Sequence, residues 1–302
     1  MSTTADEKGS TTLGADFTIE TVAVLGAGTM GHGIAQVAAL SGYRVILRDL
    51  NEELISRALR TVAANLSQGV ERGKVTEDEK ERALGNIRAT TDLAETNGAD
   101  LFVEAVPERV ELKREMLRAV EAESGSRPFI FATNTSSLSI TEIAEGAGRP
   151  ERVVGMHFFN PVHLMRLVEI VVGRETSTEV VEAVREVALR MRKEPITVRD
   201  VPGFASSRLG VALGLEAMRM LEEGVASAKD IDTAMELGYN HPLGPLRLTD
   251  LVGLDVRLQI ADYLHRKLGT ERFRAPEILR RMVGEGKLGK KSGEGFYKWS
   301  EQ

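Results

Sequence analysis

Short apolar runs alternate with amphipathic segments over the first two thirds of the chain. Residues 21–25 form an apolar run that ends in glycines, and residues 44–47 form a second run. This continuous pattern is typical of strands buried in a parallel sheet. Between them, residues 30–40 have a helical composition and are followed by a glycine. Strand, glycine-rich turn, helix and strand in this order predict a βαβ unit.

The alternation continues to residue 198. Further strands are predicted at residues 101–103, 129–131, 153–156, 168–172 and 196–198. Helices are predicted at residues 51–72, from residue 76, where Thr76 and Glu79 form a capping box, and at 110–123 and 178–192. The first two of these helices form a helical excursion before the sheet resumes. The pattern predicts an α/β fold, a Rossmann-type doubly wound sheet domain over residues 18–200.

The pattern changes after residue 201, where no convincing strand is found. Helices are predicted at residues 205–223, 228–237 and 246–267, and a last one opens at Pro276 and ends near residue 284. Residues 201–302 are therefore expected to form an all-α C-terminal domain. Residues 1–17 are rich in Thr, Ser, Gly and acidic residues, and we expect a disordered tail there.

Charge and composition exclude several classes of function. The formal net charge is −6, which argues against nucleic acid as a partner, although a local basic patch for an anionic small molecule is compatible with it. There is no cysteine, so disulfides and thiolate metal sites are excluded, and no other cluster of metal ligands is evident. No apolar run approaches the roughly 20 residues needed to span a membrane. With no signal-peptide pattern, the expected location is the cytoplasm.

A glycine-rich turn follows the first predicted strand. Gly26, Gly28 and Gly31, with Thr29 and Met30 between the last two, match the GxGxxG fingerprint of dinucleotide-binding domains. The glycines permit a tight turn and a close approach of the backbone to pyrophosphate, while the helix N-terminus supplies free N–H groups.

Asp49 ends the second predicted strand, about 20 residues on, where an acidic residue binds the ribose 2′-hydroxyl of NAD. The alternative for Asp49 is a solvated turn residue. Arg48 would favour NADP, but side chains alternate along a strand, so Arg48 and Asp49 should not both face the ribose. The sequence therefore favours NAD.

His157 ends an apolar strand, at the edge of an open α/β sheet where functional groups gather. Oxidising an alcohol requires a base near neutrality, and histidine suits that task. Glu169 lies within the next apolar strand and calls for a partner, because unpaired buried charge is unfavourable. If the two strands are neighbours, Glu169 could orient His157. From the residues alone, a purely structural role for His157 is an equally good explanation.

A cluster of hydroxyl groups follows the strand at 129–131. Hydroxyls at the carboxyl end of a strand can donate hydrogen bonds to a substrate oxygen. Taken alone, residues 133–138 are better explained by helix capping, through Ser137 or Ser139.

Five segments together resemble the L-3-hydroxyacyl-CoA dehydrogenase family, over nearly the whole chain after the tail. They are Gly26-Ala-Gly-Thr-Met-Gly31, Asn134-Thr-Ser-Ser-Leu138, His157-Phe-Phe-Asn-Pro161, Asp230-Ile-Asp-Thr-Ala-Met235 and Lys290-Lys-Ser-Gly-Glu-Gly-Phe-Tyr297. The resemblance implies NAD-dependent, reversible oxidation of an (S)-3-hydroxyacyl-CoA, of short chain as in 3-hydroxybutyryl-CoA, to the 3-oxoacyl-CoA. It also implies a homodimer, formed through a C-terminal domain that helps to bind the acyl-CoA.

The resemblance assigns roles to individual residues. It implies that His157 is the general base, that Glu169 orients it, and that Ser136 holds the substrate's hydroxyl or carbonyl oxygen. Two further sets follow from it: Glu108 and Lys113, near the nicotinamide and ribose of the cofactor, and Asn134, among the cofactor-binding residues. For Lys113 an exposed ion pair at a helix start remains an alternative.

One position departs from the family pattern. Gly203-Phe-Ala-Ser-Ser-Arg208 has Ser207 where many members have an asparagine that helps to position the substrate. A serine can still form hydrogen bonds there, with a shorter reach.

Two alternatives to this function remain. One is an NAD-dependent dehydrogenase of a free 3-hydroxy acid, such as carnitine or a sugar acid. The other is a non-catalytic NAD-binding protein, since a fold alone never proves activity.

Overall fold

The computed structural model describes residues 17–299 of the 302-residue chain. The predicted tail lies outside the described residues except for Phe17, which packs against the core of the first unit. The chain divides into two compact units, one that ends at Asp200 and one that begins at Val201. Within the described residues, no helix is both long and apolar enough to cross a membrane.

A single eight-stranded sheet forms the centre of the first unit within the described residues, in the order β3-β2-β1-β4-β5-β6-β7-β8. Its strands are β1 (Thr21–Leu25), β2 (Arg44–Arg48), β3 (Ile87–Thr90), β4 (Leu101–Glu104), β5 (Ile130–Thr133), β6 (Val153–Phe158), β7 (Leu167–Val172) and β8 (Glu194–Arg199). Neighbouring strands are parallel except β6 and β7, which are antiparallel. Strand order reverses direction at β1, so the carboxyl ends of β1 and β4 flank the crevice where ligands of such sheets bind.

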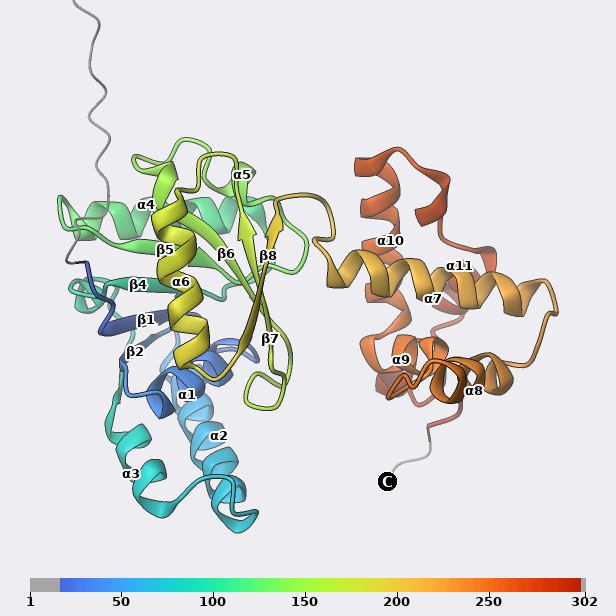
Figure 1. The fold of residues 1–302 in the computed structure, drawn as a ribbon, viewed down its shortest axis with the longest axis horizontal. Coiled ribbons are helices and arrows are strands. Elements are labelled where there is room, and N and C mark those ends of the chain that lie inside the picture. Colours follow the sequence, from blue (N-terminus) through green and yellow to red (C-terminus); the bar gives the residue numbers. More distant parts are fainter. Residues whose placement is uncertain (1–16, 300–302) are drawn as a thin grey trace, which may run out of the picture. The chain divides into compact units, whose positions relative to one another are not determined.

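Helices cover both faces of this sheet (Figure 1). They are α1 (Gly31–Leu40), α2 (Glu52–Glu71), α3 (Glu77–Gly85), α4 (Val110–Ser124), α5 (Ile140–Ile143) and α6 (Thr178–Arg190). Helices α1, α2 and α6 share one core cluster with alternate residues of the strands, such as Val24 and Val103. The intervening residues, Phe102 among them, face the other way because side chains alternate along a strand.

The structure confirms the Rossmann-type α/β fold and adds one strand to it. β3 was not predicted, because Ile-Arg-Ala-Thr carries little apolar signal and lies at the sheet edge. The capping box predicted at Thr76 is present: the Thr76 side chain accepts from the Glu79 backbone, and Glu79 binds the Thr76 backbone in return. Helices α2 and α3 project together from the sheet as the predicted excursion (Figure 1).

The second unit is helical and has its own core, which includes Leu215, Leu254 and Leu279. Its helices are α7 (Ser206–Glu222), α8 (Ala228–Gly238), α9 (Pro245–Val252), α10 (Leu254–Leu268) and α11 (Glu277–Gly284). The single helix predicted at 246–267 is wrong, because Gly253 adopts a φ of 102° and separates α9 from α10. Pro276 caps α11 instead of lying in its first turn.

Candidate active site

The glycine-rich turn joins β1 to α1, and two of its glycines are required by close contacts. A Cβ on Gly31 would lie 1.7 Å from the Gly26 carbonyl oxygen, and a Cβ on Gly26 would lie 2.7 Å from the Ala105 carbonyl oxygen. Gly28 differs, because a Cβ there would meet nothing within 4 Å. Two glycines thus make the turn tight, whereas Gly28 leaves open space in front of the backbone.

Asp49 lies against this turn. Its Oδ2 accepts a hydrogen bond from the Ala27 N–H at 2.7 Å, and its Oδ1 accepts from the Leu50 N–H at 2.7 Å. The carboxylate is therefore held at the mouth of the glycine-rich turn and is more than a solvated turn residue. Arg48, the preceding residue, is buried in the sheet.

These residues fit a dinucleotide. A cavity of about 280 Å³ opens in front of the turn and is lined by Gly28, Thr29, His32, Arg57 and neighbouring residues. Helix α1 has no side-chain cap at Met30, so no capping side chain competes with a phosphate for its N-terminal N–H groups. Together with Asp49 at the end of β2, this is the donor and acceptor set that pyrophosphate and ribose require.

His157 and Glu169 lie directly opposite each other on β6 and β7. The distance between His157 Nδ1 and Glu169 Oε2 is 2.7 Å, and the Glu169 side chain is completely buried. Because a carboxylate only accepts, Nδ1 carries the proton and Nε2 of the neutral ring is left as the basic atom. The Phe159 ring packs against the imidazole with centroids 4.4 Å apart. The arrangement can take a proton from a hydroxyl group.

The turn after β5 carries Asn134, Thr135 and Ser136. Asn134 Oδ1 accepts from the Phe158 N–H at 2.9 Å, which ties this turn to the end of β6 beside His157. Thr135 Oγ1 accepts from the Leu138 N–H at 2.9 Å and closes the turn. Ser139 caps α5, as one of the two capping candidates. Ser139 is therefore the residue that caps the helix, whereas Ser136 makes other contacts.

Glu108 gathers the hydrogen bonds of this turn. Its Oε1 accepts from Thr135 Oγ1 at 2.6 Å, from the Ser136 N–H at 2.9 Å and from Ser136 Oγ at 3.2 Å. Its Oε2 lies 3.4 Å from Lys113 Nζ. Lys113 is fully buried, so an exposed ion pair at this position is wrong; its neighbour Glu104 occupies the end of β4.

Glu104 was missed from the sequence. It is fully buried, and its carboxylate accepts from Lys113 Nζ, from Thr133 Oγ1 at 2.6 Å and from the Val106 N–H at 2.7 Å. Burial raises the pKa of the Glu104 carboxyl, against the opposing effect of Lys113. The signal was present, because Glu104 ends an apolar strand much as Glu169 interrupts one.

Ser207 belongs to the second unit, in the first turn of α7, and is half-buried. The predicted site residues of the first unit are brought together by the sheet itself, whereas Ser207 lies in the second unit.

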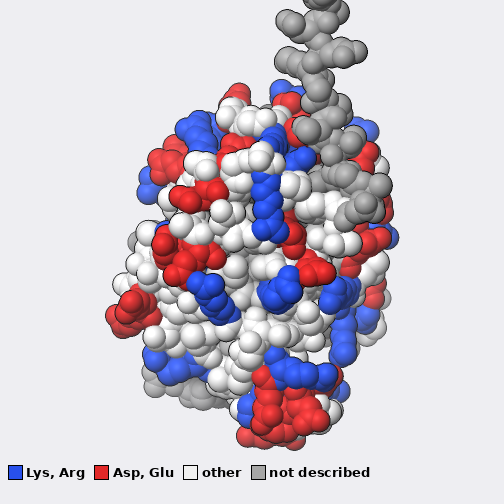
Figure 2. Space-filling view, turned by 90° about the vertical axis from the view of Figure 1, so that its left-hand side faces the viewer, with Lys and Arg blue, Asp and Glu red and all other residues white. Residues whose placement is uncertain are grey.

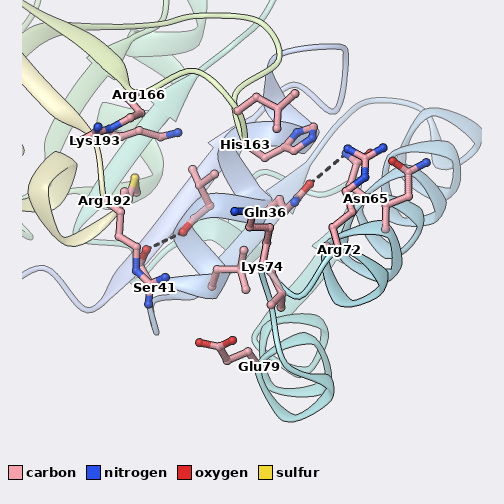
Figure 3. A pocket seen from close by; sticks show the side chains of 17 residues that line it. Gln36, Ser41, Asn65, Arg72, Lys74, Glu79, His163, Arg166, Arg192 and Lys193 are labelled. Carbon is pink, nitrogen blue, oxygen red and sulfur yellow. Dashed lines mark hydrogen bonds between the residues drawn. The ribbon is translucent and has the colours of Figure 1, made fainter.

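A second and larger cavity of about 400 Å³ lies in the first unit, between α1, α2 and the loop after β6 (Figure 3). Basic side chains line it, namely Arg72, Lys74, Arg166, Arg192 and Lys193, together with His163 and the carboxylate of Glu79. Lys193 is held by the Val162 and Met165 carbonyl oxygens, and Arg166 pairs with Glu194. Arg72, Lys74 and Arg192 have no carboxylate within salt-bridge distance among residues 17–299. This is the local basic patch that the overall charge left open.

Comparisons with known proteins decide the family. Residues 21–201 match the NAD-binding domain of 3-hydroxyacyl-CoA dehydrogenases, and residues 203–299 match the C-terminal domain of the same enzymes. The chain belongs to the 3-hydroxyacyl-CoA dehydrogenase family.

Individual members of the family are similar over nearly their whole length. A probable 3-hydroxybutyryl-CoA dehydrogenase of Deinococcus radiodurans is 45% identical over 91% of this chain and 99% of its own. The 3-hydroxybutyryl-CoA dehydrogenase of Clostridioides difficile is 40% identical over 93% of this chain and 99% of its own. The crystal structure of (S)-3-hydroxybutyryl-CoA dehydrogenase from Ralstonia eutropha has a TM-score of 0.91, with 39% identity, and covers 94% of this chain and 100% of that one.

Membership of the 3-hydroxyacyl-CoA dehydrogenase family makes this chain an NAD-dependent oxidoreductase, as its sequence predicted. The first unit contains the family's NAD-binding domain, and the glycine-rich turn and Asp49 lie within it. Family membership does not assign roles to single side chains; the interatomic distances in the site support those roles.

Proposed function

We propose that this enzyme catalyses the reversible oxidation of a short-chain (S)-3-hydroxyacyl-CoA, such as 3-hydroxybutyryl-CoA, to the 3-oxoacyl-CoA. The observation that carries the proposal is the contact between His157 and Glu169 at 2.7 Å at the carboxyl end of β6. The relatives named above, which bear the name 3-hydroxybutyryl-CoA dehydrogenase, support the choice of substrate.

The chemistry follows from the side chains. His157 Nε2 takes the proton of the 3-hydroxyl group, and Glu169 stabilises the imidazolium that results. NAD, when bound, accepts the hydride that leaves C3. The Ser136 hydroxyl, which donates to Glu108 Oε1 in this structure, turns its proton to the oxygen at C3 as that oxygen becomes a carbonyl. Ser207 is proposed to take the role of the family's asparagine. In the reverse direction, the imidazolium returns the proton.

The cofactor is held by the glycine-rich turn. The N–H groups at the start of α1 would bind the pyrophosphate, Gly28 would leave room for it, and Thr29 and Met30 would contribute to the same site. Asp49 binds the ribose, which favours NAD over NADP because its charge repels a 2′-phosphate. Glu108, Lys113 and Asn134 are proposed to support the nicotinamide end.

The cationic cavity in Figure 3 supports a CoA ester over a free acid. Coenzyme A carries several phosphate charges, whereas a free 3-hydroxy acid has one carboxylate. Arg72, Lys74 and Arg192 supply positive charge to this cavity, against the negative charge of Glu79. On the face in Figure 2, by contrast, basic and acidic side chains are interspersed, and acidic ones gather at the lower end, so this face favours no polyanionic partner.

We also infer a homodimer through the second unit. Exposed apolar side chains follow α9 and the start of α10: Leu248, Leu251, Val252 and Val256. Apolar side chains that are exposed together mark association surfaces. A Leu251→Glu variant is expected to sediment as a monomer. The lack of cysteine fits the reducing cytoplasm, where we propose that the enzyme works.

The test compares NADH oxidation with acetoacetyl-CoA and with free acetoacetate. The CoA ester is expected to give a kcat/KM about 100-fold higher or more, since binding energy from the CoA moiety is used at the reacting carbon. Arg72→Gln should raise the KM for acetoacetyl-CoA about tenfold and leave the KM for NADH unchanged, because one charge-assisted contact is lost. Arg44→Gln, which removes an exposed arginine paired with Glu20, serves as control. Equal rates with the free acid would favour the 3-hydroxy acid alternative. If neither compound leads to oxidation of NADH, a non-catalytic NAD-binding protein would be favoured.

A further inference from the structure

A buried ion pair lies behind the turn that carries Ser136, and its carboxylate, Glu104, has no role in the steps proposed above. Glu104 and Lys113 are both fully buried, and Lys113 Nζ lies 2.8 Å and 3.0 Å from the two carboxylate oxygens of Glu104. Burying two charges is unfavourable unless geometry and further hydrogen bonds compensate for lost hydration, and such pairs are weak contributors to stability. Stability of the fold therefore does not explain this pair, which indicates a functional role.

The pair is connected to the turn through a second carboxylate. Lys113 Nζ also lies 3.4 Å from Glu108 Oε2. The other oxygen of Glu108 accepts from the Thr135 hydroxyl and from both the N–H and the hydroxyl of Ser136. Glu104, Lys113, Glu108 and Ser136 therefore form one continuous chain of contacts, from the end of β4 across the start of α4 to the turn after β5.

The distances show how the positive charge is shared. Both oxygens of Glu104 are closer to Lys113 Nζ than the Glu108 oxygen is. Glu104 thus neutralises most of the lysine charge. Glu108 is anchored by Lys113 without being drawn fully onto it, and its carboxylate keeps the negative charge with which it accepts three hydrogen bonds from the turn.

We propose that Glu104 is a positioning residue for the Ser136 hydroxyl, acting through Lys113 and Glu108. The proposal rests on the proposed function, in which Ser136 binds the substrate oxygen. With Glu104 neutral, Lys113 turns to Glu108 alone and draws its carboxylate away from Thr135 and Ser136. The turn then loosens, although no group that touches substrate has been altered.

The first test measures the turn directly and does not depend on activity. Deuterium uptake by peptides that contain Ser136 is compared between the wild-type protein and Glu104→Gln. Exchange of the Ser136 amide is expected to be about tenfold faster in the variant, because its acceptor is displaced. Arg114→Gln is the matched control, since Arg114 lies on the same helix but binds the Glu142 carbonyl and Glu145 instead. Unchanged uptake in Glu104→Gln would overturn the proposal.

The second test separates positioning from a general loss of structure. Glu104→Gln should lower kcat with acetoacetyl-CoA about tenfold. Combined with Ser136→Ala, it should cause little further loss, since residues that act through one another are not additive. Losses that multiply in the double variant would show that Glu104 acts elsewhere. If the wild-type enzyme does not reduce CoA esters, the proposed function fails, and the deuterium uptake still decides the link from Glu104 to Ser136.

A double variant without either buried charge provides a further test if Glu104→Gln does not fold. Glu104→Gln combined with Lys113→Met removes both buried charges, which is often tolerated. Glu108 then loses its anchoring cation, so faster exchange at Ser136 is expected again. Wild-type exchange in this double variant would contradict the proposal.

Discussion

His157 and Glu169 face each other across the only antiparallel strand pair of the described sheet, with 2.7 Å between Nδ1 and Oε2. A residue pair in register on adjacent strands is fixed by the backbone ladder, so neither side chain depends on a loop for its position. The turn that carries Asn134 is bonded to the next residue of the same strand, Phe158. The proposed base and the proposed substrate-binding turn are thereby both held at the carboxyl end of β6.

Glu169→Gln tests the orienting role. A glutamine keeps the size of the side chain but can present an N–H to Nδ1, which would then accept and move the ring proton to Nε2, the atom that must act as base. We expect kcat to fall about 10²- to 10⁴-fold with little change in the KM for NADH. Glu194→Gln, on the exposed neighbouring strand β8, is the matched control. A kcat within twofold of wild type would remove Glu169 from the mechanism.

Asp49→Asn tests cofactor choice. The variant loses the charge that repels a 2′-phosphate, and an amide nitrogen competes for the place of the oxygen that accepts from Ala27. The ratio of kcat/KM for NADH to that for NADPH is expected to fall about tenfold or more. Asp92→Asn, at the turn after β3, should leave the ratio as it is. A wild-type preference for NADPH would instead point to Arg48 and reverse the assignment.

Asp250 gives the second unit a pH-dependent stability. It is almost fully buried and accepts from the Phe296 and Tyr297 N–H groups and from Trp299 Nε1. Burial raises the pKa of Asp250 above its ordinary value, so the folded unit binds a proton more readily than the unfolded chain. The contribution of Asp250 to the free energy of unfolding is therefore fully present below about pH 3.9, the pKa of an aspartate in the unfolded chain. It is lost as the pH rises through the raised pKa of the folded unit.

Urea unfolding followed by the fluorescence of Trp299, the single tryptophan, measures this contribution. Asp250→Asn leaves donors unpaired and should lower the unfolding free energy by about 1–3 kcal/mol. The difference between wild type and variant should be larger at pH 4 than at pH 7. A difference that grows with pH would show that the pKa is lowered in the folded unit.

Much of the fold could be predicted from the sequence because its strands are buried on both faces. Such strands appear as continuous apolar runs, as in β1 and β4, and their glycine-rich punctuation is unambiguous. β3 carries only one strongly apolar residue, Ile87, and forms at the sheet edge by pairing with β2, which is a tertiary effect. The break at Gly253 was likewise missed, since apolar periodicity continues through it from α9 to α10.

The candidate site was predictable where a single residue breaks a pattern. His157 and Glu169 stand out against apolar strands, and their contact depends only on strand adjacency. Lys113 could not be placed in this way, because its sequence position suggests an exposed helix start, whereas the partner that buries it, Glu104, comes from a strand. The cationic cavity is assembled from residues between 36 and 193, and no local motif reports such a set.

The most direct measurement is the rate of NADH oxidation by acetoacetyl-CoA in the wild-type enzyme and in His157→Ala, with NADH binding followed in both by fluorescence. The wild type is expected to turn over the CoA ester, and His157→Ala to lose about 10³-fold or more of kcat while it binds NADH with nearly unchanged affinity. Turnover that survives in His157→Ala would contradict the assignment of the base, and with it the mechanism proposed for this member of the family.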